Sequence, residues 1–169
     1  AFSKGGLTPF GKEFVKACDD LGIVIDVSHL NREGFGELAQ FYSGKFIASH
    51  SNGDIVDNFY AQHRNLSPEQ IEEIKKRNGL IGLNFCRDFI EIDGVEGVLA
   101  LKTQLDYFCQ HGCENVIALG SDYDGCSMHR DFCGVEKLRF VYNSLLGEGF
   151  TEDFLNKVFY ENARKFFNI

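Results

Sequence analysis

Three side chains that can bind a metal ion or move a proton follow short apolar runs of this sequence. They are His29, His50 and Asp122, which follow the runs 23–27, 46–48 and 116–119. Imidazole and carboxylate groups bind zinc, and both serve as general acids and bases. If the fold brings the three groups together, they could activate a water molecule for hydrolysis.

Apolar runs of this length are typical of buried strands, on which side chains alternate between two faces. His29 then shares a face with Val27. His50 likewise shares a face with Ala48, and Asp122 shares a face with Ala118 and Gly120. Each apolar face therefore ends, at its C-terminal tip, in a reactive group. In a parallel α/β barrel the active site is built at these tips.

The rest of the sequence predicts the elements that position these tips. Cap residues and three-to-four apolar spacing predict helices at 8–21, 33–42, 67–78, 95–111, 135–146 and 151–166. Strands are expected from 23 onward and at 45–49, 79–85 and 115–120, with a polar loop at 51–66. Alternating strands and helices predict a parallel sheet covered by helices, which is an α/β fold. Glycine-rich phosphate loops are missing from the sequence, which disfavours a nucleotide-binding fold.

Composition excludes several classes of protein. The 169 residues suffice for one domain with a core, and the 17 phenylalanines predict that this core is rich in Phe. A net charge of −8 without a basic cluster argues against a nucleic-acid partner. No apolar run approaches the roughly 20 residues that span a bilayer, so we expect no membrane segment.

The six cysteines are expected to be reduced, mostly buried thiols, which agrees with a cytoplasmic localisation. Cys109 and Cys113 lie four residues apart and could share a helix face. We interpret them as two buried thiols in preference to a zinc-binding pair.

Five short motifs, in order, resemble the membrane (renal) dipeptidase family. They are GLTPFG at 6–11, IDVSH at 25–29, SHS at 49–51, HRNL at 63–66 and GSDYDG at 120–125. NAR at 162–164 also resembles the C-terminal signature of the family. The resemblance implies a metal-dependent hydrolase on a (β/α)₈ TIM-type barrel. It implies that residues 1–169 form the second half of that barrel, about four β/α units and a C-terminal helix.

The family's first-half ligands have no counterpart in this sequence. These are a His-x-Asp pair, a bridging Glu and an upstream His that assists the substrate. The intact family enzyme holds two zinc ions, whereas this chain shows one half-site. We therefore expect the chain to need a missing N-terminal half or to self-associate, and we do not expect activity from the chain alone.

The resemblance assigns roles to four residues. His29 and His50 would bind one zinc ion, and Asp122 would take a proton from the attacking water and pass it to the leaving amine. Arg64 would bind the terminal carboxylate of a small dipeptide through two hydrogen bonds. Each residue also has a structural interpretation: core histidines, a turn aspartate and a surface ion pair, respectively.

Other polar residues near these motifs are given structural interpretations. Asp26 and Ser28 are expected to point away from the histidine face and to bond nearby backbone. Cys86 is interpreted as core packing and Asp124 as a turn residue. His63 is expected to be structural or exposed, whereas His111 and His129 carry no motif and are expected to face solvent.

The resemblance therefore implies a zinc-dependent dipeptidase, a hydrolase that cleaves the peptide bond of dipeptides with metal-activated water. One alternative is another amidohydrolase-like metal-dependent hydrolase, since such enzymes also use histidines and a late aspartate at strand tips. A second alternative is a non-catalytic half-barrel that self-associates, because a four-stranded sheet has open edges that can pair with another chain.

Overall fold

A computed structural model describes residues 2–169 and shows one four-stranded parallel sheet. Its strands are β1 (Ile25–Asp26), β2 (Phe46–Ala48), β3 (Leu80–Leu83) and β4 (Ile117–Leu119). They pair in sequence order, with Ile25 beside Phe46, Ile47 beside Leu80, and Ile81 beside Ile117. The α/β class with a parallel sheet is confirmed. Because all four strands are parallel, their C-terminal ends meet along one edge of the sheet.

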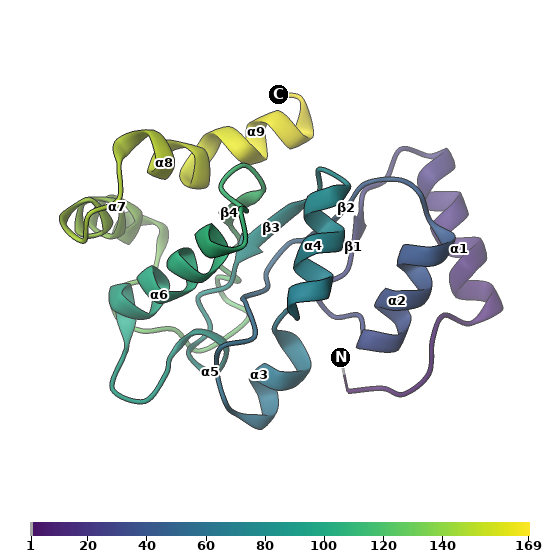
Figure 1. The fold of residues 1–169 in the computed structure, drawn as a ribbon, viewed down its shortest axis with the longest axis horizontal. Coiled ribbons are helices and arrows are strands. Elements are labelled where there is room, and N and C mark those ends of the chain that lie inside the picture. The colour runs from purple at the N-terminus through teal and green to yellow at the C-terminus, as the bar shows by residue number, and fades with distance from the viewer. Residues whose placement is uncertain (1) are drawn as a thin grey trace.

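Helix α1 precedes the first strand, and the other helices connect the strands or follow the last one (Figure 1). They are α1 (Pro9–Asp20), α2 (Arg32–Phe41), α3 (Phe59–Arg64), α4 (Pro68–Lys76), α5 (Arg87–Ile90), α6 (Gly97–Gln110), α7 (Leu138–Gly147), α8 (Glu152–Asn156) and α9 (Asn162–Phe167). Figure 1 shows the chain running from α1 and α2 at one end of the molecule to α7 and α8 at the other, with the strands between them. Among the described residues, no helix is both long and apolar enough to cross a bilayer.

The predicted helix starts follow the expected capping chemistry. The hydroxyl of Thr8 accepts a hydrogen bond from the amide of Gly11 at the start of α1. Ser67 and Gln70 form a reciprocal capping box on α4, and Thr151 caps α8. These local bonds satisfy amides that a helix leaves without internal partners.

The core between the sheet and the helices is less rich in phenylalanine than the composition predicted, because five phenylalanines are buried and seven are exposed. Phe46, Phe85, Phe108 and Phe132 are each fully buried. Phe85 stacks on Phe132 with ring centroids 4.8 Å apart. Most of the other buried apolar residues are Leu, Ile and Val, and their burial adds to the hydrophobic stabilisation of the domain.

Two glycines let the last strands approach the segment that carries His50. A Cβ at Gly120 would lie 1.9 Å from the carbonyl oxygen of Ser49, and one at Gly82 would lie 2.0 Å from the same atom. Any side chain at either position would collide with backbone. The backbone just before His50 therefore packs directly against β3 and the end of β4.

The structure differs from the sequence-based expectation in five respects. The strands are shorter than predicted, so His29, His50 and Asp122 lie on turns just after the strands. The segment 51–66, expected to be a loop, contains α3, and α5 was not expected. The last predicted helix is divided into α8 and α9 by a π-helical turn at Lys157–Glu161, and a 3₁₀ turn at Val135–Lys137 precedes α7.

Candidate active site

The two histidines meet at the C-terminal edge of the sheet. The turn after β1 carries His29 and the turn after β2 carries His50, and their Nε2 atoms lie 2.9 Å apart. The ring centroids are 4.9 Å apart. The parallel pairing of β1 with β2 brings together two residues that are 21 positions apart in the sequence. A core interpretation does not fit His29, which is exposed.

Arg64, at the end of α3, is buried beside the histidines. It is only 7% exposed, and one guanidinium nitrogen, Nη2, lies 3.5 Å from the backbone carbonyl of His50. The guanidinium carbon lies 5.4 Å from the centre of the Phe89 ring. The other terminal nitrogen, Nη1, is buried without a hydrogen-bond partner among the described residues. The surface ion-pair interpretation is therefore wrong.

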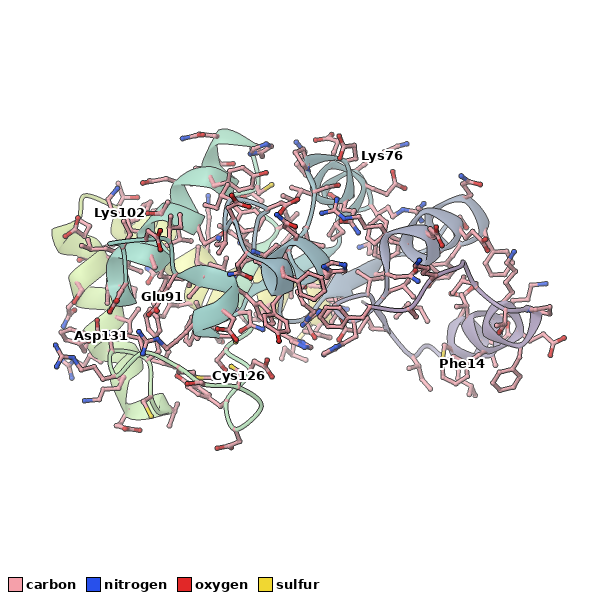
Figure 2. All side chains as sticks on the ribbon, turned by 90° about the horizontal axis from the view of Figure 1, so that it is seen from below. Phe14, Lys76, Glu91, Lys102, Cys126 and Asp131 are labelled. Carbon is pink, nitrogen blue, oxygen red and sulfur yellow. The ribbon has the colours of Figure 1, made fainter. Side chains whose placement is uncertain are left out.

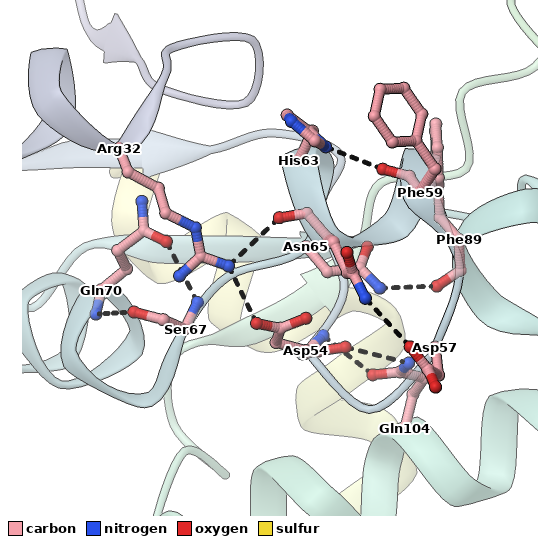
Figure 3. A network of polar contacts seen from close by, with 12 residues as sticks. Arg32, Asp54, Asp57, Phe59, His63, Asn65, Ser67, Gln70, Phe89 and Gln104 are labelled. Atoms are coloured by element: carbon pink, nitrogen blue, oxygen red, sulfur yellow. Dashed lines mark hydrogen bonds and ion pairs between the residues drawn. The ribbon is translucent and has the colours of Figure 1, made fainter. Parts of the chain in front are cut away.

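Polar contacts hold the segment that carries Arg64 (Figure 3). The Asn65 amide donates to the carbonyl of Phe89 at 2.9 Å, and Gln104 from α6 accepts from the amide of Gly53 at 2.9 Å. Arg32 binds the carboxylate of Asp54 at 2.8 Å. The segment 53–65, which contains α3, is therefore tied by these contacts to α2, α5 and α6.

Asp122 lies on the turn after β4, in a left-handed backbone conformation with a φ of 63°. Its Oδ2 atom accepts a hydrogen bond from Nδ2 of Asn84 at 3.1 Å. Its Oδ1 atom lies over Gly125, where a Cβ would come within 2.3 Å of that oxygen. Asp124 also has a positive φ of 64° and is exposed, which matches its interpretation as a turn residue.

Sequence reasoning missed Asn84, which is fully buried just after β3. Its Nδ2 also lies 3.4 Å from the carbonyl of His50, and its Oδ1 accepts from the amide of Cys86 at 2.7 Å. The side chain of Asn52 bonds both the amide and the carbonyl of Asn84, at 3.1 and 3.0 Å. The available signal was the position of Asn84 within an otherwise apolar run.

A second set of polar contacts lies behind His50. Nδ1 of His50 is 2.7 Å from the hydroxyl of Ser49, which in turn donates to Oδ2 of Asp26. Oδ1 of Asp26 accepts from the amides of Ser28 and Ser49 at 3.1 and 3.0 Å. The backbone bonds of Asp26 were expected, whereas its link to His50 through Ser49 was missed.

The four predicted site residues lie close enough to influence one another electrostatically. Partial burial and the positive charge of Arg64 lower the pKa of His29, and Asp122 opposes that shift. Burial also lowers the pKa of Arg64, against the opposing charges of Asp122 and Asp26. Partial burial raises the pKa of Asp26, but hydrogen bonds from Ser49 and Ser28 outweigh it, so the net pKa lies below the usual value. A lowered pKa favours neutral imidazole in His29, which is the form that binds metal.

The donor set fits a zinc ion. Two nitrogens bound to one tetrahedral zinc at about 2.0–2.1 Å would lie about 3.3 Å apart, close to the observed 2.9 Å between the Nε2 atoms. The Nδ1 atom of His50 is occupied by Ser49, which leaves Nε2 as its ligand atom. Zinc-binding histidines usually have their second nitrogen held in this way.

A different cluster with metal-binding atoms lies elsewhere in the fold. Glu91, Glu96 and His129 place their ligand atoms within 4.8 Å of one another. Arg87 binds Glu91 at 2.8 Å and lies 3.6 Å from Glu96, so the chain itself supplies a cation to both carboxylates. Figure 2 shows Glu91 at the opposite end of the molecule from Phe14 of α1.

The expectation that His111 and His129 face solvent is wrong. The side chain of His129 is 16% exposed and lies 3.2 Å from the carboxylate of Asp131. His111 is half-buried, and the centre of its ring lies 4.3 Å from the centre of the Tyr107 ring. His63, by contrast, is exposed and bonds the carbonyl of Phe59 at 2.8 Å.

All six cysteines are free thiols, as predicted. Cys18, Cys86 and Cys113 are buried, whereas Cys133 is exposed. Burial raises the pKa of Cys113 and of Cys109 to about 11 each. Within residues 2–169, neither belongs to a group of three or more possible metal ligands.

Comparison with known proteins identifies the family. The sequence profile of the membrane dipeptidase family, peptidase family M19, matches residues 1–169. An uncharacterized protein in the pqqA 5′ region of Klebsiella pneumoniae is 30% identical over 161 residues, which cover 93% of this chain and 58% of that protein.

Two solved structures share this fold. One is a dipeptidase described as a metallopeptidase of family M19, with a TM-score of 0.88 and 30% identity over 97% of this chain and 49% of that one. The other is a metallopeptidase from Rhodobacter sphaeroides liganded with a phosphinate mimic of the dipeptide L-Ala-D-Ala. Its TM-score is 0.89, with 29% identity over 98% of this chain and 48% of that one. The chain thus spans about half the length of these relatives, and it belongs to the membrane dipeptidase family.

Proposed function

We propose that this chain contributes half of the active site of a zinc-dependent dipeptidase. The observation that carries the proposal is the convergence of two Nε2 atoms, 2.9 Å apart, beside a buried guanidinium. A buried cation normally has a partner, because an uncompensated charge is costly to remove from water. The buried, unpartnered Nη1 of Arg64 is therefore suited to an anionic group of the substrate.

Each residue has a distinct part in the proposed reaction. His29 and His50 would hold zinc, which when bound supplies Lewis-acid activation of water and of the peptide carbonyl. Arg64 would grip the terminal carboxylate of a dipeptide through two parallel hydrogen bonds. Asp122, whose carboxylate is oriented by Asn84, would take the proton of the attacking water and return it to the leaving amine.

The relatives support a dipeptide as the substrate class. The Rhodobacter sphaeroides metallopeptidase was solved with a phosphinate mimic of L-Ala-D-Ala. A dipeptide carries its free carboxylate within a few ångströms of the scissile bond, so a cation beside the metal ligands could orient it. An amidohydrolase-like enzyme acting on phosphoesters, the main alternative, would not need that contact.

Zinc binding tests the proposal directly. The purified chain would be equilibrated with zinc, dialysed, and analysed for metal by elemental analysis. We expect about one zinc per chain, lost in His29→Ala and in His50→Ala. His63→Ala is the matched control, because His63 is exposed and outside the site. Equal zinc in all three variants, or none in the wild-type chain, would contradict the proposed half-site.

Substrate choice is a second test. The chain would be combined with the N-terminal half of a family relative and assayed with dipeptides and with phosphoesters. Turnover of dipeptides supports the proposal, and turnover of phosphoesters alone would favour the amidohydrolase-like alternative.

A further inference from the structure

We propose that Asp26, acting through Ser49, holds His50 in the tautomer that carries its proton on Nδ1. The Nε2 lone pair is then always directed to the place where the two histidines meet. Asp26 is in this view a positioning residue, since it touches neither His29 nor the ring of His50. Only the benefit to metal binding rests on the proposed function, because the tautomer itself can be measured without any metal.

The hydrogen bond between Ser49 and Asp26 can have only one direction. An ionised carboxylate has no proton and can only accept hydrogen bonds. The close contact between the Ser49 hydroxyl and Oδ2 of Asp26 therefore uses the proton of the hydroxyl. Ser49 has no other side-chain proton to give.

The second bond must then run from histidine to serine. Nδ1 of His50 lies 2.7 Å from the Ser49 oxygen, which is a full hydrogen bond. Since that oxygen has already given its proton to Asp26, it can only accept here, and Nδ1 must carry the proton. The neutral imidazole ring has one proton in total, so Nε2 keeps its lone pair.

The orientation of Asp26 is itself fixed by the sheet. Its Oδ1 accepts from the backbone amides of Ser28 and Ser49, at 3.1 and 3.0 Å, which leaves Oδ2 directed at the Ser49 hydroxyl. The backbone of Ser49 packs on Gly82 and Gly120, where no side chain would fit. The carboxylate and the hydroxyl therefore have little freedom to separate.

The neighbouring hydroxyl agrees with this arrangement. Ser28 Oγ accepts the backbone amide of His50 at 3.0 Å and lies 3.4 Å from Ser49 Oγ. Its own proton can point to Ser49, which has a lone pair left. The hydroxyl of Ser28 therefore does not prevent Nδ1 of His50 from donating its hydrogen bond to Ser49 Oγ.

The substitution Asp26→Asn is expected to reverse the chain of hydrogen bonds. The two backbone amides would keep the side-chain oxygen of asparagine at the Oδ1 position, so its NH₂ group would face Ser49. Ser49 would then accept from asparagine and donate its proton to Nδ1 of His50. The ring would move its own proton to Nε2, in a side chain of nearly unchanged size.

The experiment is a long-range ¹H–¹⁵N correlation spectrum of histidine-labelled, metal-free protein, recorded at mildly alkaline pH. It reports which ring nitrogen carries the proton. We expect Nδ1–H for His50 in the wild-type chain and Nε2–H in Asp26→Asn. Asp19→Asn is the matched control, because Asp19 also accepts a hydroxyl, from Tyr42 at 3.1 Å, far along the chain from His50.

Two results would overturn the inference: Nε2–H in the wild-type chain, or Nδ1–H retained in Asp26→Asn. If Asp26→Asn does not fold, Ser49→Ala tests the same point. We expect both tautomers in Ser49→Ala, and an unchanged, single Nδ1–H form would contradict the inference.

Zinc affinity, measured by competition with a chelator, separates this inference from the proposed function. Mutation of a residue that orients a metal-binding histidine typically lowers metal affinity about 10- to 100-fold. We expect such a decrease in Asp26→Asn, where the proton would move to Nε2, but not in Asp19→Asn. A tautomer change in a chain that binds no zinc would support the inference and contradict the proposed function. If the chain binds zinc through His50 but Asp26→Asn does not change the tautomer, the result would support the proposed function and contradict this inference.

Discussion

Asn84 donates a hydrogen bond from its Nδ2 atom to Oδ2 of Asp122 at 3.1 Å, and this bond joins the end of β3 to the turn after β4. Asp122 lies in a left-handed conformation that is uncommon for residues other than glycine, asparagine and aspartate. The bond from Asn84 helps to hold that turn, so the orientation of the Asp122 carboxylate depends on a buried neighbour.

Asn84→Ala should lower the free energy of unfolding by about 2–4 kcal/mol, because it leaves the amide of Cys86 and the carboxylate of Asp122 without their partner. Urea denaturation measures the change. Asn143→Ala is the control, since Asn143 is exposed on α7 and should shift stability by less than about 0.5 kcal/mol. Equal effects of the two substitutions would contradict the structural role of Asn84.

Gly120→Ala and Gly36→Ala should change stability in opposite directions. A Cβ at Gly120 would lie 1.9 Å from the backbone oxygen of Ser49, and overpacking of this kind costs about 1–3 kcal/mol or more. A Cβ at Gly36, within α2, meets nothing within 4 Å, and alanine should stabilise that helix by about 0.5–1 kcal/mol. Thermal unfolding of both variants tests the prediction, which fails if Gly120→Ala unfolds at or above the wild-type temperature.

Arg64→Lys should raise KM for a dipeptide about 10- to 100-fold in any preparation that hydrolyses one, with a smaller effect on kcat. Lysine cannot make two parallel bonds to a carboxylate, and a hydrogen bond to a charged group contributes about 1.5–3 kcal/mol. Arg87→Lys is the control, because Arg87 makes ion pairs with Glu91 and Glu96 away from the histidines. An unchanged KM in Arg64→Lys would contradict the proposal that Arg64 binds the carboxylate of the substrate.

Stability should fall as the pH rises from about 9 to about 11. Burial raises the pKa of the Cys113 thiol from its usual 9.0 to about 11, so the unfolded chain loses this proton first. The unfolded state then binds fewer protons than the folded state, and the free energy of unfolding decreases with pH in that window. Below the usual thiol pKa of 9.0 both states keep the proton, so the contribution of Cys113 to the free energy of unfolding is fully present.

Urea midpoints measured across this window test the effect of Cys113. Cys113→Ala should flatten the decline, whereas Cys133→Ala, at an exposed thiol, should leave its slope unchanged. A wild-type slope in Cys113→Ala would show that this thiol does not contribute.

The isolated chain should not be a stable monomer. Among the described residues, β1 and β4 are the edges of the sheet, and each can pair with another chain. Next to β1, Ile23 and Val24 are 52% and 39% exposed, which adds apolar surface to that edge. Light scattering should show a species larger than the 19.1 kDa of one chain, and a monodisperse monomer would contradict the prediction.

Local patterns in the sequence were enough to predict the frame of the molecule. Alternating strands and helices predicted a parallel sheet, and cap residues such as Thr8 and Ser67 predicted where helices begin. Both signals depend on neighbours within a few positions. The histidine-bearing turns follow from the same patterns, because parallel strands end at one edge.

Only the tertiary structure decided how these residues are held. Asn84 and Asp122 are 38 positions apart, and Asp26 and Ser49 are 23 apart, so no local pattern pairs them. The burial of Arg64 depends on α3, which forms in a segment whose polar composition resembled a loop. The sequence by itself determined which reactive groups reach the sheet edge. Packing between distant segments decided which atoms they present there, because hydrogen-bond partners and burial depend on contacts made only in the folded chain.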